Sequence, residues 1–421
     1  MIYDVCVIGG GASGLAAAVA AGREGASVLV LERMDKTGKK IQATGNGKCN
    51  LTNAAIVRRH IPAGAYRCRQ RNFPVQVLNA FDCGDTLSFF ESMGLYTRNR
   101  DNYIYPLSEQ ASAVGDALKW ALAENKTDVM TREEVCSVQI IKDVRQGRFL
   151  IKTDKAVYRS RKLILAAGGK SAEKLGSNGS GYELCRQLGH RILPVVPALC
   201  ALCCREKYFK ELAGIRLQGR IQLLIDGKVA AEDRGELQLT AYGISGIPVF
   251  QVSRYGAYGL LDRRDVRAVL DLMPDLDQET LMARLLYQTK AHPEWTMGMI
   301  LSGMMNRKLV LCLLKLCGSD SSLTCRQAGK RLLSALVSRI KHMEVHITGT
   351  NGFEQSQVTA GGVDTREIDA YNMSSKIVRG LYITGELLDV DGICGGYNLQ
   401  WAWATGVLAG MDAGRSYNDK G

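Results

Sequence analysis

Three glycines near the N-terminus, Gly9, Gly11 and Gly14, have the spacing of a nucleotide-binding turn. An apolar run over residues 5–8 precedes them and an alanine-rich run over residues 15–23 follows, which predicts a strand, a turn and a helix in that order. In such a turn the first glycine allows the tight bend, the second lets the backbone approach a pyrophosphate, and the third permits close contact of helix and strand. The free N–H groups of the helix N-terminus would face the phosphates.

A carboxylate follows at the position where a ribose is expected. The apolar run 27–31 predicts a second strand, and it ends in Glu32, 18 residues beyond Gly14. An acid at this place favours a free ribose, which means the ADP half of FAD or NAD rather than NADP.

Later segments favour FAD over NAD. Residues 36–53 are dense in glycine, amide and lysine and show almost no apolar face, which suits a long extended ligand; a flexible surface loop is the alternative. Two further apolar runs, 163–169 and 380–386, end in glycine or in glycine and acid, as where a sheet passes close beneath a cofactor.

A glycine pair at 395–396 leads into a segment of helical composition over residues 397–409. The N-terminus of such a helix would direct unpaired N–H groups at the N1–C2=O edge of a flavin, where negative charge develops on reduction. An ordinary buried helix with Trp401 and Trp403 in its packing is the alternative, but it leaves the glycine pair unexplained.

Composition sets the limits for these interpretations. The 421 residues, 46% apolar and 23% charged, are enough for two or three packed domains, and no run approaches the roughly 18 apolar residues of a membrane span. The apolar N-terminus lacks a basic leader and a cleavage site, so we expect a cytoplasmic protein. The net charge of +12 favours an anionic cofactor, an acidic substrate or RNA. The basic stretch 58–71 is interpreted as a solvated loop, with a docking patch as the alternative.

Thirteen cysteines and five histidines are scattered along the chain. Without an export signal, reduced thiols packed as small hydrophobic groups are expected. The cluster Cys200, Cys203 and Cys204 lacks a second ligand pair at a usable spacing, so no metal site is predicted.

The assembled motifs resemble the flavoprotein family described as HI0933-like, also known as the aminoacetone oxidase family or as NAD(P)/FAD-dependent oxidoreductases. The matching segments are GGGASG at 9–14, GNGKCNLTN at 45–53, AAGG at 166–169, GSNGSGY at 176–182, GELQLT at 235–240, GISG at 243–246, VTAGGV at 358–363, GE at 385–386 and GGYNLQ at 395–400. The resemblance implies an α/β fold: a doubly wound, Rossmann-like FAD-binding domain with an inserted β-rich domain and a small inserted helical domain. The expected ranges are 1–193 and 346–421 for the FAD-binding domain, 194–274 for the β-rich domain and 275–345 for the helical domain.

The resemblance also implies which residues bind FAD. Ser13, Gly14 and Glu32 would lie on the ADP moiety, with Val135 as an adenine-side backbone contact. The full expected set is Gly9, Gly11, Ala12, Ser13, Gly14, Glu32, Lys40, Gly45, Asn46, Asn50, Val135, Gly168, Gly385, Glu386, Asn398 and Leu399. Relatives often have an acid where this chain has Ser180 and threonine where it has Cys394.

A flavin oxidoreductase that moves a hydride between N5 and an organic substrate is the expected activity, because flavin carries the electrons and the protein needs few groups of its own. Tyr397, Lys48 and Cys394 are the candidate proton donors, since they lie inside the cofactor-facing motifs. The resemblance favours reduction of a conjugated double bond in a 3-oxo bile acid, with oxidation of small amines such as aminoacetone as the alternative. No second dinucleotide-binding unit is present, so NAD(P)H is expected as a transient donor, or another protein delivers the electrons.

Two hypotheses from other functional classes stay open. One is a flavin-bearing protein that binds RNA or modifies tRNA, although the basic residues are spread out and no RNA-binding module is recognised. The other is a redox sensor without turnover. The sequence does not disclose the oligomeric state.

Overall fold

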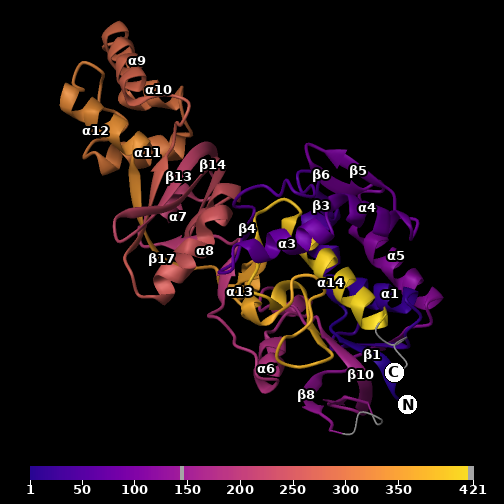
Figure 1. The fold of residues 1–421 in the computed structure, drawn as a ribbon. Coiled ribbons are helices and arrows are strands. Elements are labelled where there is room, and N and C mark those ends of the chain that lie inside the picture. The colour runs from indigo at the N-terminus through magenta and orange to yellow at the C-terminus, as the bar shows by residue number, and fades with distance from the viewer. Residues whose placement is uncertain (143–146, 416–421) are drawn as a thin grey trace. The chain divides into compact units, whose positions relative to one another are not determined.

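The computed structural model describes residues 1–142 and 147–415, which form two compact units (Figure 1). The first unit comprises residues 1–196 and 357–421 of the chain, and the second comprises residues 197–356. The doubly wound α/β class with an inserted β-rich part is confirmed by the sheets described below.

A seven-stranded sheet forms the centre of the first unit, in the order β7-β2-β1-β10-β9-β8 with β19 also paired to β10. Its strands are β1 (Tyr3–Ile8), β2 (Val28–Glu32), β7 (Asp128–Thr131), β8 (Val135–Ile140), β9 (Phe149–Thr153), β10 (Val157–Leu165) and β19 (Leu381–Ile383). Strands β7, β2, β1, β10 and β19 are mutually parallel, while β9 and β8 are antiparallel additions. The continuous apolar runs of β1 and β2 follow from burial on both faces of a parallel sheet.

Shorter elements complete the first unit. The helices are α1 (Ala12–Arg23), α2 (Lys39–Ala43), η1 (Thr44–Gly47), α3 (Asn72–Ala80), α4 (Cys83–Glu91), α5 (Ala111–Glu124), η3 (Glu173–Leu175), α6 (Ser180–Gln187), η4 (Thr365–Glu367), η5 (Gly385–Leu387) and α14 (Tyr397–Arg415). The strands are β3 (Thr52–Asn53), β5 (Thr97–Arg100) and β6 (Tyr103–Pro106) in one small sheet, β4 (Tyr66–Arg67) and β20 (Asp391–Gly392) in another, and β18 (Val358–Ala360). Strand β11 (Val196–Ala198) spans the boundary between the units.

Helices α1 and α14 lie side by side with their backbones in close approach (Figure 1). Glycines of α14 at intervals of four residues make this possible. A Cβ atom on Gly406 would lie 2.3 Å from Ser13 O, and one on Gly410 would lie 2.2 Å from Ala17 O. The alanine-rich sequence of α1 therefore serves helix-on-helix contact as well as packing on the sheet.

Substitution of Gly410 by alanine is expected to lower the free energy of unfolding by about 3 kcal/mol, because the new methyl group overlaps a backbone oxygen that cannot move alone. Gly115 in α5 is the matched control, since a Cβ there meets only Gln42 Nε2 at 3.9 Å. Gly115→Ala should stabilise its helix by about 0.5 to 1 kcal/mol. Urea unfolding of both variants measures the difference, and equal midpoints would contradict the close packing.

The second unit contains a closed barrel in the order β12-β15-β14-β13-β16-β17. Its strands are β12 (Leu202–Cys204), β13 (Arg216–Ile225), β14 (Lys228–Thr240), β15 (Gly243–Ser245), β16 (Val266–Asp271) and β17 (Met343–Thr350). Its helices are α7 (Phe209–Leu212), α8 (Ile247–Leu261), α9 (Gln278–Ala291), α10 (Met297–Ser302), α11 (Arg307–Leu316), α12 (Lys330–Lys341) and α13 (Gly352–Gln355). A turn at Asp226 and Gly227 joins β13 to β14, with both residues at positive φ.

The helices α9 to α12 follow β16 and precede β17, so the helical segment is an excursion between two neighbouring barrel strands. Contacts group it with the barrel in one compact unit. The division at 274/275 into separate β-rich and helical domains stays a prediction. The strand-rich interpretation of residues 194–274 missed α8, which starts after Gly246 at φ +105° and carries Pro248 in its first turn.

Within residues 1–142 and 147–415, no helix is both long enough and apolar enough to cross a membrane. All thirteen cysteines are free thiols.

Candidate cofactor and active site

The glycine turn between β1 and α1 forms an open cradle. Gly9 has φ +108°, and a Cβ there would lie 2.4 Å from Ala166 O; a Cβ on Gly14 would lie 1.9 Å from Gly9 O. Gly11 differs, because a Cβ there would meet nothing within 4 Å. Two glycines therefore keep backbone segments in contact, while Gly11 borders free space at the start of α1.

The first turn of α1 is suited to a phosphate. Gly11 is the N-cap residue, no side chain caps the helix, and the first turn has no acidic residue. The backbone N–H groups of Ala12, Ser13 and Gly14 thus lack intrahelical partners, and the helix dipole adds positive potential there. Free N–H groups beside an open glycine fit the pyrophosphate of FAD. A pyrophosphate at this place is what the strand, turn and helix seen in the sequence predict.

Glu32 ends β2 with its side chain 9% exposed. Its Oε2 accepts a hydrogen bond from Gly10 N at 2.7 Å, and its Oε1 accepts one from Met34 N at 2.7 Å. Each oxygen keeps a further lone pair that could accept a ribose hydroxyl. These hydrogen bonds fix the orientation of the carboxylate, and the bond from Gly10 N also holds the glycine turn in place.

A pocket beside the turn brings together residues that are distant in sequence, including Gly9, Glu32, Arg33, Val135 and Gly176. Arg33 Nε donates to Gly176 O at 3.0 Å, which ties the glycine-rich segment 176–182 to the end of β2. Val135, expected on the adenine side, lies in this wall. The residues lining the pocket therefore fit the adenosine end of FAD.

Replacement of Glu32 by glutamine is expected to weaken FAD binding by about 10-fold or more. The amide must turn an NH2 group toward Gly10 N or Met34 N, and an unsatisfied buried donor costs about 1 to 3 kcal/mol. The dissociation constant is measured by quenching of flavin fluorescence on reconstituting the apoprotein. The control is Glu183→Gln, an exposed member of an α6 ion pair, and equal affinities for the two variants would exclude this role for Glu32.

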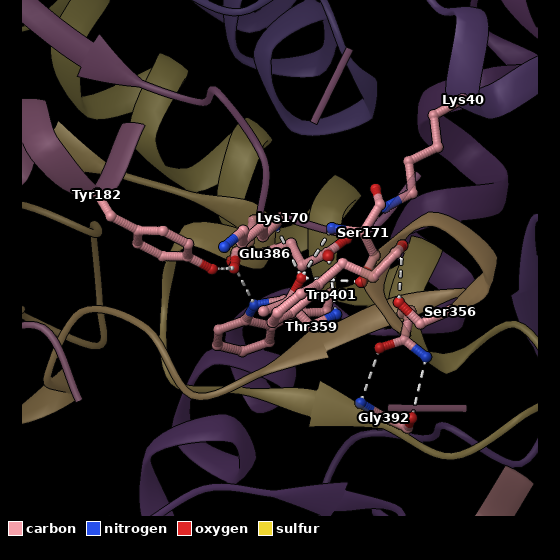
Figure 2. Close-up of polar contacts among 12 residues, drawn as sticks. Lys40, Lys170, Ser171, Tyr182, Ser356, Thr359, Glu386, Gly392 and Trp401 are labelled. Atoms are coloured by element: carbon pink, nitrogen blue, oxygen red, sulfur yellow. Dashed lines mark hydrogen bonds and ion pairs between the residues drawn. The ribbon is translucent and has the colours of Figure 1, made fainter. Parts of the chain in front are cut away.

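Lys40 of α2 and Glu386 of η5 meet although they are far apart in the chain (Figure 2). Lys40 Nζ lies 2.9 Å from Glu386 Oε2 and donates to Ser171 O at 3.2 Å. Glu386 Oε1 accepts from Thr359 N at 2.9 Å. Both side chains are mostly buried, with 26% and 20% exposed. Through these contacts the pair links four segments of the first unit: α2, η5 and the backbone at Ser171 and at Thr359.

Thr359 holds the backbone of the turn over residues 168–171, which follows the end of β10. Its Oγ1 accepts hydrogen bonds from Lys170 N at 2.8 Å and Ser171 N at 3.1 Å (Figure 2). Gly168, one of the expected FAD-binding residues, precedes this turn with φ +73°. The structure thus brings Gly168 near the Lys40–Glu386 pair through the 168–171 turn.

The segment 44–53 reaches the start of α14. Gly45 and Asn46 have φ of 56° and 53°, in the left-handed region that glycine and asparagine tolerate. With its amide oriented to suit its neighbours, Asn50 donates to Thr52 O at 3.0 Å and accepts from Gly396 N at 3.2 Å. The Asn50 amide therefore joins segment 44–53 to the glycine pair before α14.

Asn398 closes the loop before α14. Its Oδ1 accepts from Gly392 N at 2.8 Å and its Nδ2 donates to Gly392 O at 3.0 Å (Figure 2). Gly395 and Gly396 have φ of 115° and 93°, which an L residue rarely adopts. Leu399 packs against the core of the first unit. The side chain of Asn398 therefore fixes the backbone where α14 begins. A ligand at this helix end would meet the free backbone N–H groups of the first turn of α14.

The three candidate proton donors have different surroundings. Tyr397 is 6% exposed, and burial raises the pKa of its hydroxyl, so it is protonated at neutral pH. Lys48 is half exposed and forms an ion pair with Glu109 at 3.0 Å, which helps to hold the pKa of Glu109 below its usual range. Cys394 is half-buried directly before the glycine pair. The assignment of a catalytic group stays a prediction.

Sequence reasoning missed the residues that hold Gly385. Trp401 Nε1 donates to Gly385 O at 3.0 Å, and Gly385 N donates to Thr405 Oγ1 at 2.9 Å. Trp401 was expected only as packing, and Thr359 was not singled out. The one available signal was the spacing of four residues between Trp401 and Thr405, which places both on one face of a helix.

Known proteins resemble this chain over nearly its whole length. The HI0933-like protein Rossmann domain family matches residues 3–412. The chain is 42% identical to the 3-dehydro-bile acid delta(4,6)-reductase of Clostridium scindens, covering 97% of this chain and 98% of that protein. It is 30% identical to the ribosomal RNA dihydrouridine synthase of Escherichia coli, again covering 97% and 98%.

Among solved structures, the fold is similar to that of 3-ketosteroid delta1-dehydrogenase from Sterolibacterium denitrificans in complex with 1,4-androstadiene-3,17-dione. The TM-score is 0.51 at 12% identity, with 99% of this chain and 100% of that chain covered. The family match over nearly the whole length and the glycine cradle lead to the same conclusion: the chain belongs to the HI0933-like family of Rossmann-type, FAD-binding flavin oxidoreductases.

Proposed function

We propose that this protein reduces a conjugated C=C bond of a 3-oxo, steroid-like substrate, with FAD as resident cofactor and NAD(P)H as electron donor. The observation that carries the proposal is the 42% identity, over nearly the whole of both chains, to a bile-acid delta(4,6)-reductase. The net charge of +12 favours an anionic substrate, which carries either a free carboxylate or the phosphates of a coenzyme A thioester.

The residues of the chain have separable tasks in this reaction. The N-terminus of α1 and Glu32 would hold the ADP half of FAD, and Lys40 with Glu386 would position the segments that flank the remainder. FAD, when bound, supplies hydride transfer. The N-terminus of α14 stabilises negative charge placed before it, and Tyr397 Oη retains its proton at neutral pH, as a proton donor must.

The test follows the visible flavin band of the purified holoenzyme without oxygen. NADH or NADPH should bleach the band, and a 3-oxo-4-ene bile acid should restore it in stoichiometric amount. Recovery only after oxygen is admitted, with aminoacetone acting as the reductant, would replace this proposal with the amine oxidase. No bleaching by either nicotinamide would assign the electrons to another donor.

A second candidate is reduction of uridine in RNA, since the 30% identity to the dihydrouridine synthase has the same coverage. Dihydrouridine formation also saturates a C=C bond conjugated to a carbonyl group. Residues 276–342 carry ten Lys and Arg against four Asp and Glu, which is half of the net charge of the chain. The stretch 58–71 contributes less than its composition suggests, because Arg58 pairs with Asp85 and Arg67 lies 3.9 Å from Asp391.

RNA binding is tested by gel retardation of ribosomal RNA fragments at physiological salt. Under the RNA reading, alanine at the exposed Lys330 and Arg331 of α12 should abolish retardation, whereas alanine at the exposed Arg69 and Arg71 should not. Absence of retardation by the unaltered protein would remove this candidate.

A further inference from the structure

A cavity of about 410 Å³ lies wholly within the second unit. Three segments line it: residues 215–218 at the start of β13, residues 272–276 after β16, and residues 304–306 with Leu309 at the start of α11. None of these residues belongs to the expected FAD-binding set. Ligand pockets for small molecules commonly have volumes of about 300 to 1,000 Å³, so the space suits a molecule of several rings.

The inner wall of this cavity is apolar and well supported. Ile215, Leu272 and Leu309 are 3%, 5% and 2% exposed, so their packing fixes the wall. Met304 and Met305, which also line the cavity, are flexible and polarisable side chains that adapt to the shape of an apolar ligand.

The segment 272–276 is fastened by a buried cation. Lys341 Nζ lies 2.8 Å from Asp271 Oδ2 and also donates to Met273 O and Leu276 O. The side chains of Lys341 and Asp271 are only 9% and 7% exposed. This wall of the cavity therefore has a fixed backbone, while the methionines adjust.

The rim is polar but carries no unbalanced charge. Arg216 pairs with Glu236 at 3.2 Å, and Asp275 pairs with Arg234. The exposed amide of Gln218 makes no hydrogen bond within the part of the chain that the structure describes. The group at the rim that can bind a ligand is therefore the neutral amide of Gln218, and no unpaired charge among the described rim residues selects for a charged ligand.

From this arrangement we propose that the cavity is a second small-molecule site, which binds a steroid-sized apolar molecule with an uncharged oxo or hydroxyl group at its outer end. The ring body fills the space between Leu217, Leu272 and Met305, and the oxygen atom hydrogen-bonds with Gln218 at the rim. The proposal goes beyond the reductase activity, because it requires binding only, in a unit that holds none of the expected FAD ligands.

The test is photolabelling of the oxidised holoenzyme, without any reductant, by a 3-oxo-4-ene steroid that carries a diazirine on its ring body. Labelled peptides identified by mass spectrometry should contain residues 215–218, 272–276 or 304–309, and excess unlabelled steroid should suppress the labelling. Labelling confined to residues 1–196 and 357–415 would overturn the proposal. Since the flavin stays oxidised, a failure of the reductase assay leaves this result unaffected.

Two variants and a control sharpen the test. Met305→Asp places a charge in the cavity and should weaken steroid binding at least 10-fold, whereas Met299→Asp, on the 57% exposed Met299 of α10, should not. Gln218→Ala alters only an exposed side chain and should weaken binding about 3-fold to 10-fold through loss of one hydrogen bond. Unchanged affinity in Gln218→Ala and folded Met305→Asp would also overturn the proposal, with the visible flavin spectrum and the thermal midpoint confirming the fold of each variant.

Discussion

Alanine at Gly11 is expected to abolish tight FAD binding while the apoprotein stays folded. A Cβ at this position meets no atom within 4 Å, and the backbone is extended with φ −86°, so the protein itself accepts the methyl group. The methyl group instead occupies the space through which a pyrophosphate approaches the first turn of α1. Loss of two charge-assisted hydrogen bonds would cost about 3 kcal/mol or more, which is about 100-fold in the dissociation constant.

The measurement is the ratio of FAD to protein after gel filtration, together with the thermal midpoint of the apoprotein. Gly329→Ala is the matched control, because Gly329 is likewise an N-cap glycine in extended conformation with nothing within 4 Å of its Cβ position. Gly14→Ala should behave differently from both, since its Cβ overlaps Gly9 O at 1.9 Å and the fold itself would be lost. Full FAD occupancy in Gly11→Ala would show that the cradle does not hold the pyrophosphate.

Methionine at Lys341 is expected to destabilise the second unit by about 3 to 5 kcal/mol. The substitution keeps the apolar length of the side chain but leaves Asp271 as an uncompensated charge in the interior. It also leaves Met273 O and Leu276 O without their ammonium donor. Limited proteolysis of the holoenzyme should then cut within residues 272–276 at a denaturant concentration that the unaltered protein withstands.

The double variant Lys341→Met with Asp271→Leu tests the cause. Removing both charges should restore part of the lost stability, because a buried ion pair is often replaced by apolar groups at little cost. Recovery will be incomplete, since Met273 N loses its bond to Asp271 Oδ1 at 3.0 Å. If the double variant were less stable than Lys341→Met alone, the unpaired charge would not be the source of the effect.

Local sequence patterns predicted the glycine turn and the acid at the end of β2. They did not predict contacts between residues that are far apart in the chain. The turn over Gly9 to Gly14 and the acid at Glu32 form a strand, a turn, a helix and a strand in succession, so their roles are visible in one short stretch. The contact between Lys40 and Glu386 joins residues 346 positions apart, and no spacing in the sequence encodes it. The resemblance placed both residues along the cofactor, and the structure adds that they touch.

The inserted part shows the same division. The helical domain that the resemblance implies over residues 275–345 contains α9 to α12, and each of these helices has an apolar face at local spacing. The closing of the barrel was not predictable, since β17 pairs with β12 and β16 across the whole helical excursion. The amide of Asn50, which joins the start of α14 to segment 44–53, likewise acts over a distance that a sequence window does not cover.

The contact of α14 with α1 has a consequence for biosynthesis. Gly406 and Gly410 press against the backbone of α1, and β19 adds to β10 only after more than 200 further residues have been made. During translation the first helix and its glycine turn therefore leave the ribosome long before the strands and helix that complete their surroundings. A nascent chain would expose this apolar surface until α14 emerges, so we expect flavin to load only after α14 has been made and expression to depend on chaperones that shield the early segment.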